Sequence, residues 1–112
     1  MPYISVTLAK KLDDTTKQKL VSAIGQKVTL LPNKNEAGLM VAVNDGCPLY
    51  FAGVPAAGAA FVDVRLFHES VHEAKEKFTL AMKDVLSEIC GVEKMYLNYL
   101  EFQNWGSEKG LR

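Results

Sequence analysis

MPYISVTL, residues 1–8, sets the arrangement of the whole chain. Tyr, Ile, Val and Thr favour extended backbone, and Ile4, Val6 and Leu8 recur at the period of a strand. The segment therefore predicts a β-strand with one face in the core. Pro2 stands at its beginning, where a strand tolerates proline.

Pro2 directly follows the first methionine, and a small residue or proline at this position favours removal of Met1. Removal leaves a free secondary amine on the first residue of a buried strand. A free α-amino group titrates near ~7.7–8.0, and burial or a nearby cation lowers that pKa further. A base with a pKa close to the working pH suits general acid–base catalysis. We therefore expect Pro2 to act as a base once Met1 is gone.

The composition predicts a single domain over residues 1–112, with 48% hydrophobic residues. Lys plus Arg and Asp plus Glu number 13 each, so no net charge attracts nucleic acid or an anionic membrane. No apolar run approaches the ~18 residues of a membrane span, and no signal peptide is evident. Cys47 and Cys90 form no C-x-x-C. We expect a cytoplasmic protein without a nucleic-acid or membrane partner, a metal or a cofactor.

A strand–helix–strand unit is predicted for the first part of the chain. Asp13 or Asp14 can cap a helix with apolar residues at helical spacing, and Pro32 ends it. The following LMVAV, residues 39–43, is apolar at every position, which predicts a strand buried on both faces. Beyond a turn and a short strand-like piece, residues 54–59 are rich in Ala, Gly and Pro and are expected to be flexible.

The same order of elements returns in the second half. Residues 61–67 alternate as a strand, Ser70 is a candidate cap of a long helix, and Gly91 is placed to end that helix. Residues 94–102 predict a last strand. The polar tail, residues 103–112, is expected to be loose apart from its tryptophan.

These elements predict an α+β fold, in which duplicated βαβ units form one four-stranded sheet with two helices on one face. The helices can cover only one face, whereas the strand at 39–43 predicts apolar residues on both. The uncovered face then needs a partner, and we expect the chain to self-associate through it.

Four stretches of the sequence carry a resemblance to a known family. They are PYI (2–4), LMVAV (39–43), LYFAG (49–53) and YLNY (96–99). Together and in this order, they resemble the tautomerase superfamily, and within it the branch of macrophage migration inhibitory factor. The resemblance covers nearly the whole chain. It implies a homotrimer whose sheets line a central barrel, and keto–enol tautomerisation of small, phenylpyruvate-like α-keto acids by an N-terminal proline.

The resemblance also implies roles for individual residues. Pro2 matches the catalytic proline. Lys34 matches the lysine that holds the substrate carboxylate, and Phe67 matches the position whose backbone helps to hold it. Tyr96 and Asn98 match substrate-binding residues that a neighbouring subunit supplies.

Other interpretations stay open for part of the site. Phe102 and Trp105 are candidates for an aromatic rim of the pocket. Arg65 has no clear counterpart in this branch, and an ion pair with Asp63 or a subunit contact is the preferred explanation. Other branches use arginines in this neighbourhood to decarboxylate or dehalogenate short acids. The alternatives to a tautomerase are such an enzyme, or a non-catalytic binding or signalling protein of the same fold.

Overall fold

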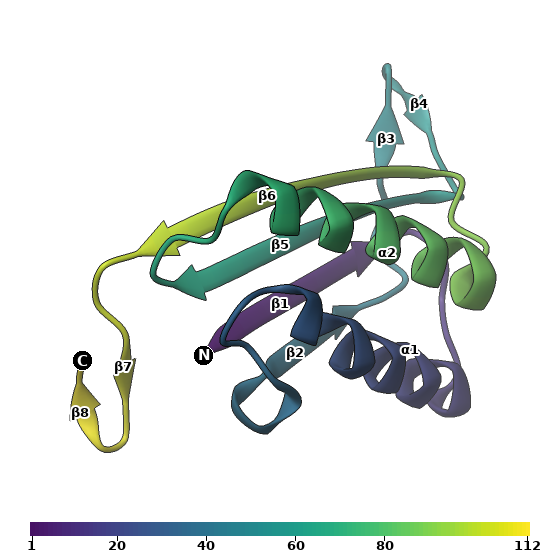
Figure 1. Cartoon of the computed structure of the whole chain (residues 1–112). Helices are drawn as coiled ribbons and strands as arrows, with labels where there is room; N and C mark the ends of the chain where they lie inside the picture. The colour runs from purple at the N-terminus through teal and green to yellow at the C-terminus, as the bar shows by residue number, and fades with distance from the viewer.

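The computed structural model describes residues 1–112 and consists of one four-stranded sheet with two helices packed on it (Figure 1). Its long elements are β1 (Pro2–Leu8), α1 (Asp14–Lys27), β2 (Met40–Asn44), β5 (Ala59–Phe67), α2 (His72–Cys90) and β6 (Lys94–Phe102). The strand order is β2-β1-β5-β6. β1 is parallel to β2, β5 is parallel to β6, and β1 and β5 are antiparallel. The predicted pair of βαβ units is therefore confirmed.

Short elements fill the connections and the tail. They are the 3₁₀ helices η1 (Val28–Leu30) and η2 (Glu36–Gly38), and the strands β3 (Tyr50–Phe51), β4 (Val54–Pro55), β7 (Gly106–Ser107) and β8 (Gly110–Leu111). β3 and β4 form a hairpin at one end of the sheet, and β7 and β8 form another at the opposite end (Figure 1).

The β7–β8 hairpin corrects the prediction of a loose tail. Trp105 and Arg112 exchange two backbone hydrogen bonds, of 3.1 and 2.9 Å, that close it. The segment 54–59, expected to be flexible, likewise begins in β4 and ends in β5. In both places backbone pairing supplies the order that composition does not predict.

The predicted helix ends agree with the structure at Asp13 and Gly91 but not at Ser70, and α1 ends at Lys27, five residues before the predicted stop at Pro32, with η1 between them. The Asp13 carboxylate caps α1 by accepting a hydrogen bond of 2.8 Å from the Thr16 N–H. Gly91 ends α2 in a left-handed conformation, with φ of 66°, which glycine adopts at low cost. Ser70 does not cap α2: its N–H donates to the Glu101 carboxylate at 2.6 Å, and α2 has no side-chain cap.

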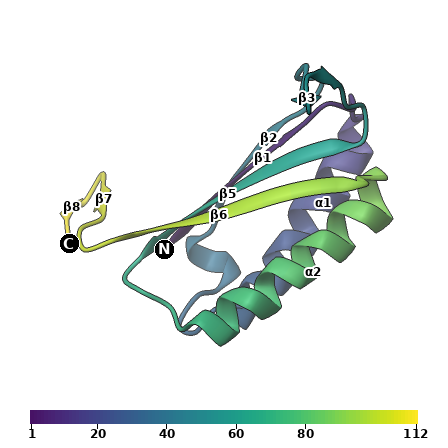
Figure 2. The same ribbon diagram turned by 90° about the horizontal axis from the view of Figure 1, so that it is seen from above.

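The hydrophobic core lies between the sheet and the helices. Ile4, Val6 and Leu8 are fully buried, as the alternation in β1 predicts. The largest side chains that the rest of the chain adds are Leu20, Ile24, Leu31, Leu66, Phe78, Met82 and Leu86. Burial of one such side chain contributes about 1.5–3 kcal/mol. These contacts hold both helices on one face of the sheet, as Figure 2 shows.

The other face of the sheet is uncovered and mixed in character (Figure 2). A polar row crosses its middle, made of Ser5, Asp63 and Asn98 on three adjacent strands. At the β2 edge, the Asn44 amide donates to the Ser5 hydroxyl at 3.0 Å. The uncovered face is therefore mixed rather than uniformly apolar, and self-association through it stays a prediction.

β2 accounts for this difference. Val41 and Val43 pack against the core, whereas Met40 is 67% exposed and Ala42 only half-buried. β2 is an edge strand of the sheet. Within one chain the outward face of residues 39–43 is therefore bare, and its burial by a neighbouring chain stays a prediction.

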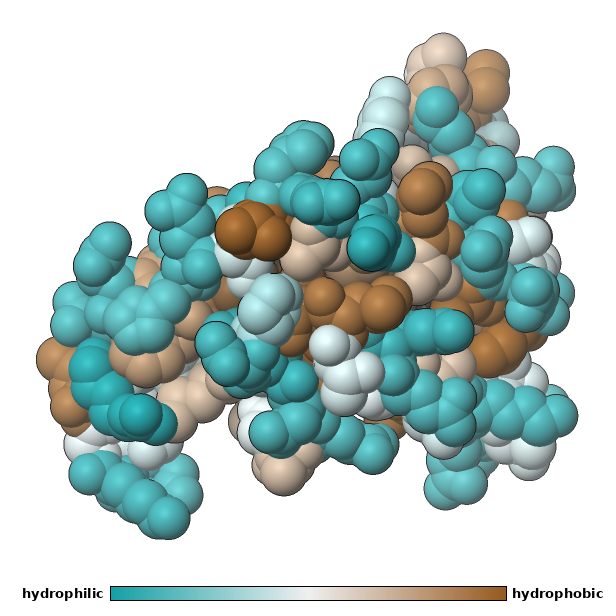
Figure 3. Space-filling view, in the orientation of Figure 1, coloured by the Kyte–Doolittle hydropathy of each residue, from teal (hydrophilic) through white to brown (hydrophobic).

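The helix-covered side of the molecule has a largely hydrophilic surface, as Figure 3 shows. Hydrophobic side chains stand out in this view over the β3–β4 hairpin, where Val54 is 59% exposed. Neither α1 nor α2 combines the length and apolarity needed to cross a membrane.

Candidate active site

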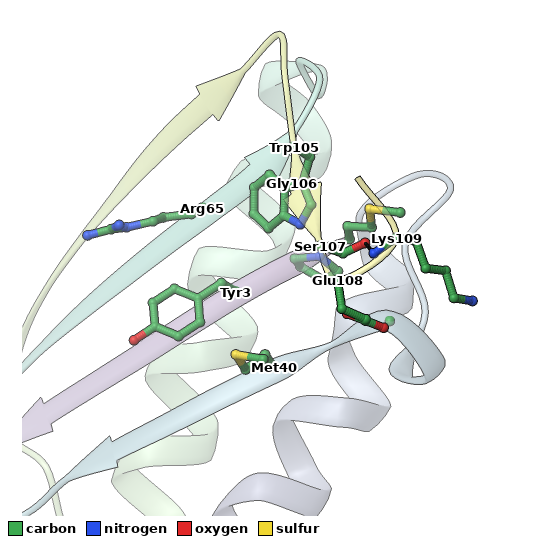
Figure 4. A pocket seen from close by; sticks show the side chains of 11 residues that line it. Tyr3, Met40, Arg65, Trp105, Gly106, Ser107, Glu108 and Lys109 are labelled. Carbon is green, nitrogen blue, oxygen red and sulfur yellow. Dashed lines mark hydrogen bonds between the residues drawn. The ribbon is translucent and has the colours of Figure 1, made fainter. Parts of the chain in front are cut away.

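A cleft of about 590 Å³ opens beside the start of β1. Pro2 lines it and is itself buried, in register with Leu66 of β5. Figure 4 shows Tyr3, Met40 and Arg65 on the sheet side of the cleft, and Trp105 with the β7–β8 hairpin on the other. The predicted base therefore lies at a cavity that the tail helps to enclose.

Lys34 and Phe67 meet at this end of the sheet. The Lys34 ammonium donates a hydrogen bond of 2.9 Å to the Phe67 carbonyl oxygen. Lys34 belongs to the connection between η1 and η2, and Phe67 ends β5 one residue beyond the partner of Pro2. Two candidate residues 33 positions apart in sequence are thus brought together.

The electrostatics of this end favour a neutral amine. Partial burial lowers the pKa of the Met1 ammonium below its ordinary value of 8.0, and the positive charges of Lys34 and Arg112 lower it further. Loss of water and nearby cations both disfavour the protonated form. An amine placed here gives up its proton more readily than one in water.

Arg112 lies beside Met1 and Phe67, a position that the sequence does not predict. Its backbone pairing with Trp105 fixes it in the tail hairpin. The guanidinium carbon lies 5.7 Å from the centroid of the Phe67 ring, and Nη1 lies 4.0 Å from the Met1 sulfur. No signal in the sequence points to Arg112, because only the folded hairpin returns it to the start of the chain.

Aromatic side chains gather around Phe67. The Trp105 ring lies 6.4 Å from that of Phe67 and 6.5 Å from that of Phe102, so the two predicted rim residues adjoin each other. His68 stacks on Phe67 at 3.8 Å and has a left-handed φ of 71°, which costs a non-glycine residue about 1–3 kcal/mol. Its N–H donates to the Phe102 carbonyl at 2.8 Å. The left-handed turn at His68 and its hydrogen bond to Phe102 set the path of the chain just beyond β5.

Tyr96 and Asn98 do not reach Pro2 within one chain. Tyr96 aligns across β5 with Thr7, five residues along β1 from Pro2. Five residues of strand span roughly 16 Å. The Tyr96 ring instead lies 5.9 Å from that of Phe51 in the β3–β4 hairpin. A role for these two residues therefore requires a neighbouring subunit.

Arg65 has no carboxylate partner. Its guanidinium carbon lies 5.7 Å from the centroid of the Tyr3 ring, and it lines the cleft. The expected ion pair between Arg65 and Asp63 is not formed. The ion pairs of the chain are Lys17–Asp45, Lys75–Glu101 and Lys83–Asp84. No group of three or more His, Cys, Asp or Glu side chains is arranged to hold a metal ion.

Comparison with known proteins identifies the fold. No protein-family model and no curated protein matches the chain. MIF2 of Leishmania major is 25% identical, with a TM-score of 0.91 over 100% of this chain and 97% of that one. The macrophage migration inhibitory factor-like protein of Entamoeba histolytica is 19% identical, with a TM-score of 0.86 over 99% and 98%. Pt0534, solved after inactivation by 2-oxo-3-pentynoate, is 16% identical, with a TM-score of 0.80 over 96% and 93%.

The structural similarity extends over nearly the whole of these chains and takes in both βαβ units of this one. The sequence resemblance and the structural similarity therefore agree: the chain has the fold of tautomerase-superfamily proteins and is similar in structure to macrophage migration inhibitory factor-like proteins.

Proposed function

We propose that the protein is a keto–enol tautomerase of small, phenylpyruvate-like α-keto acids, with Pro2 as general base after removal of Met1. The observation that carries this proposal is the position of Lys34. Its ammonium lies on the Phe67 carbonyl, at the end of the sheet where Pro2 lines a cleft. A fixed cation beside a buried amine is the arrangement that an acid–base reaction on a small carboxylate requires.

In this mechanism the neutral amine of Pro2 removes a proton from the enol oxygen or the α-carbon and returns it to the other atom. Burial and two cations lower the pKa of the Met1 ammonium. The same surroundings would act on the Pro2 amine, one residue further along. They would keep it unprotonated at neutral pH and ready to accept the proton.

The substrate carboxylate would pair with Lys34 in a charge-assisted contact, beside the backbone of Phe67. The developing oxyanion needs a hydrogen-bond donor. Within the proposal, Tyr96 or Asn98 of a neighbouring subunit supplies it, in a homotrimer like that of the resembled family. Phe102 and Trp105 would form the aromatic rim that receives the side group of the substrate.

The test begins with an intact-mass measurement that verifies removal of Met1. The ultraviolet decay of phenylpyruvate enol is then followed for wild type, Pro2→Ala and Pro55→Ala, a control proline in the β3–β4 hairpin. We expect Pro2→Ala to lower kcat/KM about 10²- to 10⁴-fold, the usual size of general-base catalysis, and Pro55→Ala to match wild type. Equal rates for all three proteins would reject Pro2 as the base.

Covalent labelling gives a second readout. 2-Oxo-3-pentynoate, which inactivates Pt0534, is an electrophilic alkyne that a free amine can attack. We expect one adduct on Met1-free wild type and none at this position when Met1 is retained. Equal labelling at this position in Met1-free protein and in protein that retains Met1 would argue against a reactive Pro2 amine.

One observation favours a second candidate function. Arg65 lines the cleft without a carboxylate partner, which suits an enzyme that decarboxylates or dehalogenates short acids. Activity on malonate semialdehyde or a haloacrylate, without activity on the enol, would favour this alternative. Absence of all these activities in Met1-free protein would favour a binding or signalling role.

A further inference from the structure

We propose that Asn33 is a positioning residue of the site: its left-handed backbone places the Lys34 ammonium on the Phe67 carbonyl. The inference rests on the proposed function, because it concerns how that site holds its cation. It is carried by the tight turn that precedes Lys34, by the free side chain of Asn33, and by the contacts that fix the loop on both sides of the turn.

Asn33 occupies the third position of this turn. The Lys34 N–H donates a hydrogen bond of 3.1 Å to the Leu31 carbonyl oxygen, which closes the turn over Pro32 and Asn33. The φ of Asn33 is 63°, and the ring of Pro32 fixes its own φ at about −65°. These values define a type II turn, in which the third residue has to be left-handed and is usually glycine or asparagine.

The Asn33 side chain itself makes no bond that would explain its presence. It is exposed, and the side-chain hydrogen bonds of this loop are formed by Lys34 and Asn35 instead. A left-handed backbone is costly for most residues and most of all for β-branched ones, whereas asparagine and glycine adopt it readily. What position 33 requires is therefore tolerance of a positive φ.

The turn matters to the site because Lys34 is held between two fixed points. On one side, Leu31 is fully buried in the core. On the other, the Asn35 side chain accepts a hydrogen bond of 3.0 Å that caps η2, and Gly38 at the end of η2 lines the cleft. With both anchors in place, the turn decides the direction in which the Lys34 side chain leaves the loop.

Asn33→Val tests the inference, because a β-branched residue disfavours the left-handed turn. We expect kcat/KM for phenylpyruvate enol to fall about five- to tenfold, the lower end of the strain that such a residue imposes. Asn33→Gly should stay within about twofold of wild type, since glycine adopts a positive φ freely. In a Lys34→Ala background, Asn33→Val should cause no further loss, because Asn33 acts through Lys34.

The pKa of the Pro2 amine gives a readout that a merely structural role would not move. The Lys34 charge is one cause of the lowered pKa of the Met1 ammonium. The other charged and titratable groups around the cleft belong to β1, β5 and the tail, namely Tyr3, Arg65, Glu108, Lys109 and Arg112. A displaced Lys34 no longer disfavours the protonated amine. Carbon-13 NMR shifts of Pro2 in Met1-free protein should therefore report a raised pKa in Asn33→Val and an unchanged one in Asn33→Gly.

Gly46→Val is the matched control for strain. Gly46, in the turn after β2, has the same φ of 63° as Asn33, and an added Cβ would lie 3.9 Å from the Lys11 side chain, an ordinary contact. Valine there imposes comparable strain at the far end of the sheet. We expect a lower urea midpoint, with kcat/KM within about twofold of wild type and an unchanged amine pKa. Should Asn33→Val fail to fold, Asn33→Ala imposes a smaller strain at the same position and replaces it.

The outcomes separate this inference from the proposed function. Wild-type kcat/KM and amine pKa in Asn33→Val, an equal loss in Asn33→Gly, or an undiminished loss in the Lys34→Ala background would each overturn the role of Asn33 and leave the tautomerase intact. Met1-free wild type without activity on the enol, but with an amine pKa that rises in Asn33→Val and not in Gly46→Val, would overturn the tautomerase and leave the role of Asn33.

Discussion

The two βαβ units anchor the starts of their helices with the same device, which we call a carboxylate clamp. In the first unit, Asp45 follows β2 and accepts a hydrogen bond of 2.8 Å from the Leu12 N–H. It also pairs at 3.4 Å with Lys17 in the first turn of α1. One acidic side chain thus ties the end of the unit to the beginning of its helix.

The second unit repeats this arrangement with different residues. Glu101, near the end of β6, accepts a hydrogen bond of 2.6 Å from the Ser70 N–H and pairs with Lys75 at 2.8 Å. Ser70 lies two residues before α2 and Lys75 three residues after its first residue, as their counterparts do around α1. The shorter ion pair makes this the tighter of the two clamps.

The clamps lie at opposite ends of the sheet, because β1 and β5 are antiparallel. The second clamp adjoins the cleft, Pro2 and Lys34, whereas the first lies at the far end. The duplicated architecture therefore stabilises both ends alike, but the candidate chemistry is confined to the end where the chain begins. Function resides in what is added to a repeated fold.

The largest expected difference in activity between the two units comes from the connections that follow their helices. The first is long and carries Lys34; the second, residues 91–93, is short. We expect Lys34→Ala to lower kcat/KM for phenylpyruvate enol about tenfold to a hundredfold, because the substrate carboxylate loses a charge-assisted contact. Glu93→Ala, in the exposed second segment, is the matched control and should retain wild-type kinetics.

The pH profile of Lys34→Ala tests the direction in which the amine pKa changes. The Lys34 charge is one cause of the lowered amine pKa at this end. Its removal should raise the amine pKa, so the acid limb of the kcat/KM profile should move to higher pH. A limb that stays in place, or no greater loss than in Glu93→Ala, would contradict the role of Lys34.

Glu101→Gln tests the clamp beside the site. Partial burial alone would raise the pKa of Glu101, but hydrogen bonds from Lys75 and Ser70 outweigh it and hold this pKa below 4.5. The stabilisation is therefore present above pH 4.5 and is lost as the pH falls through the lowered pKa. We expect the variant to lose about 1 kcal/mol of unfolding free energy at pH 7, measured in urea, and to converge with wild type in acid. A constant difference at all pH values would refute this account.

Asp45→Asn should give the smallest effect. A hydrogen bond from the Leu12 N–H, helped by Lys17, holds the pKa of Asp45 below 3.8, so this clamp also weakens as the pH falls. We expect a smaller shift of the urea midpoint than in Glu101→Gln, with kcat/KM within about twofold of wild type, as for substitutions away from a site. A loss of activity as large as that of Lys34→Ala would mean that the two ends are coupled.

The sequence predicted the repeated units well because their pattern is local. Ile4 and Leu8 of β1 and Leu20 and Ile24 of α1 recur at strand and helix spacing, and all four are fully buried. Gly91 ends α2 where a left-handed residue is needed. Such features depend on neighbours a few positions away, which the sequence displays directly.

The failures arose where distant residues meet. Ser70 has the chemistry of a cap, but Glu101, 31 residues away, takes its N–H. The tail has no hydrophobic period, and only pairing of Trp105 with Arg112 orders it. Arg65 shares a strand face with Asp63, yet it lies over Tyr3 instead.

By itself, the sequence determined the two βαβ units, the buried start of β1 and a set of candidate residues that includes Pro2 and Lys34. The tertiary structure decided which residues meet there: Lys34 with Phe67, and Arg112 with the beginning of the chain. Hydrophobic period is a property of adjacent residues, whereas these contacts exist only after two antiparallel units and a hairpin have packed against one another.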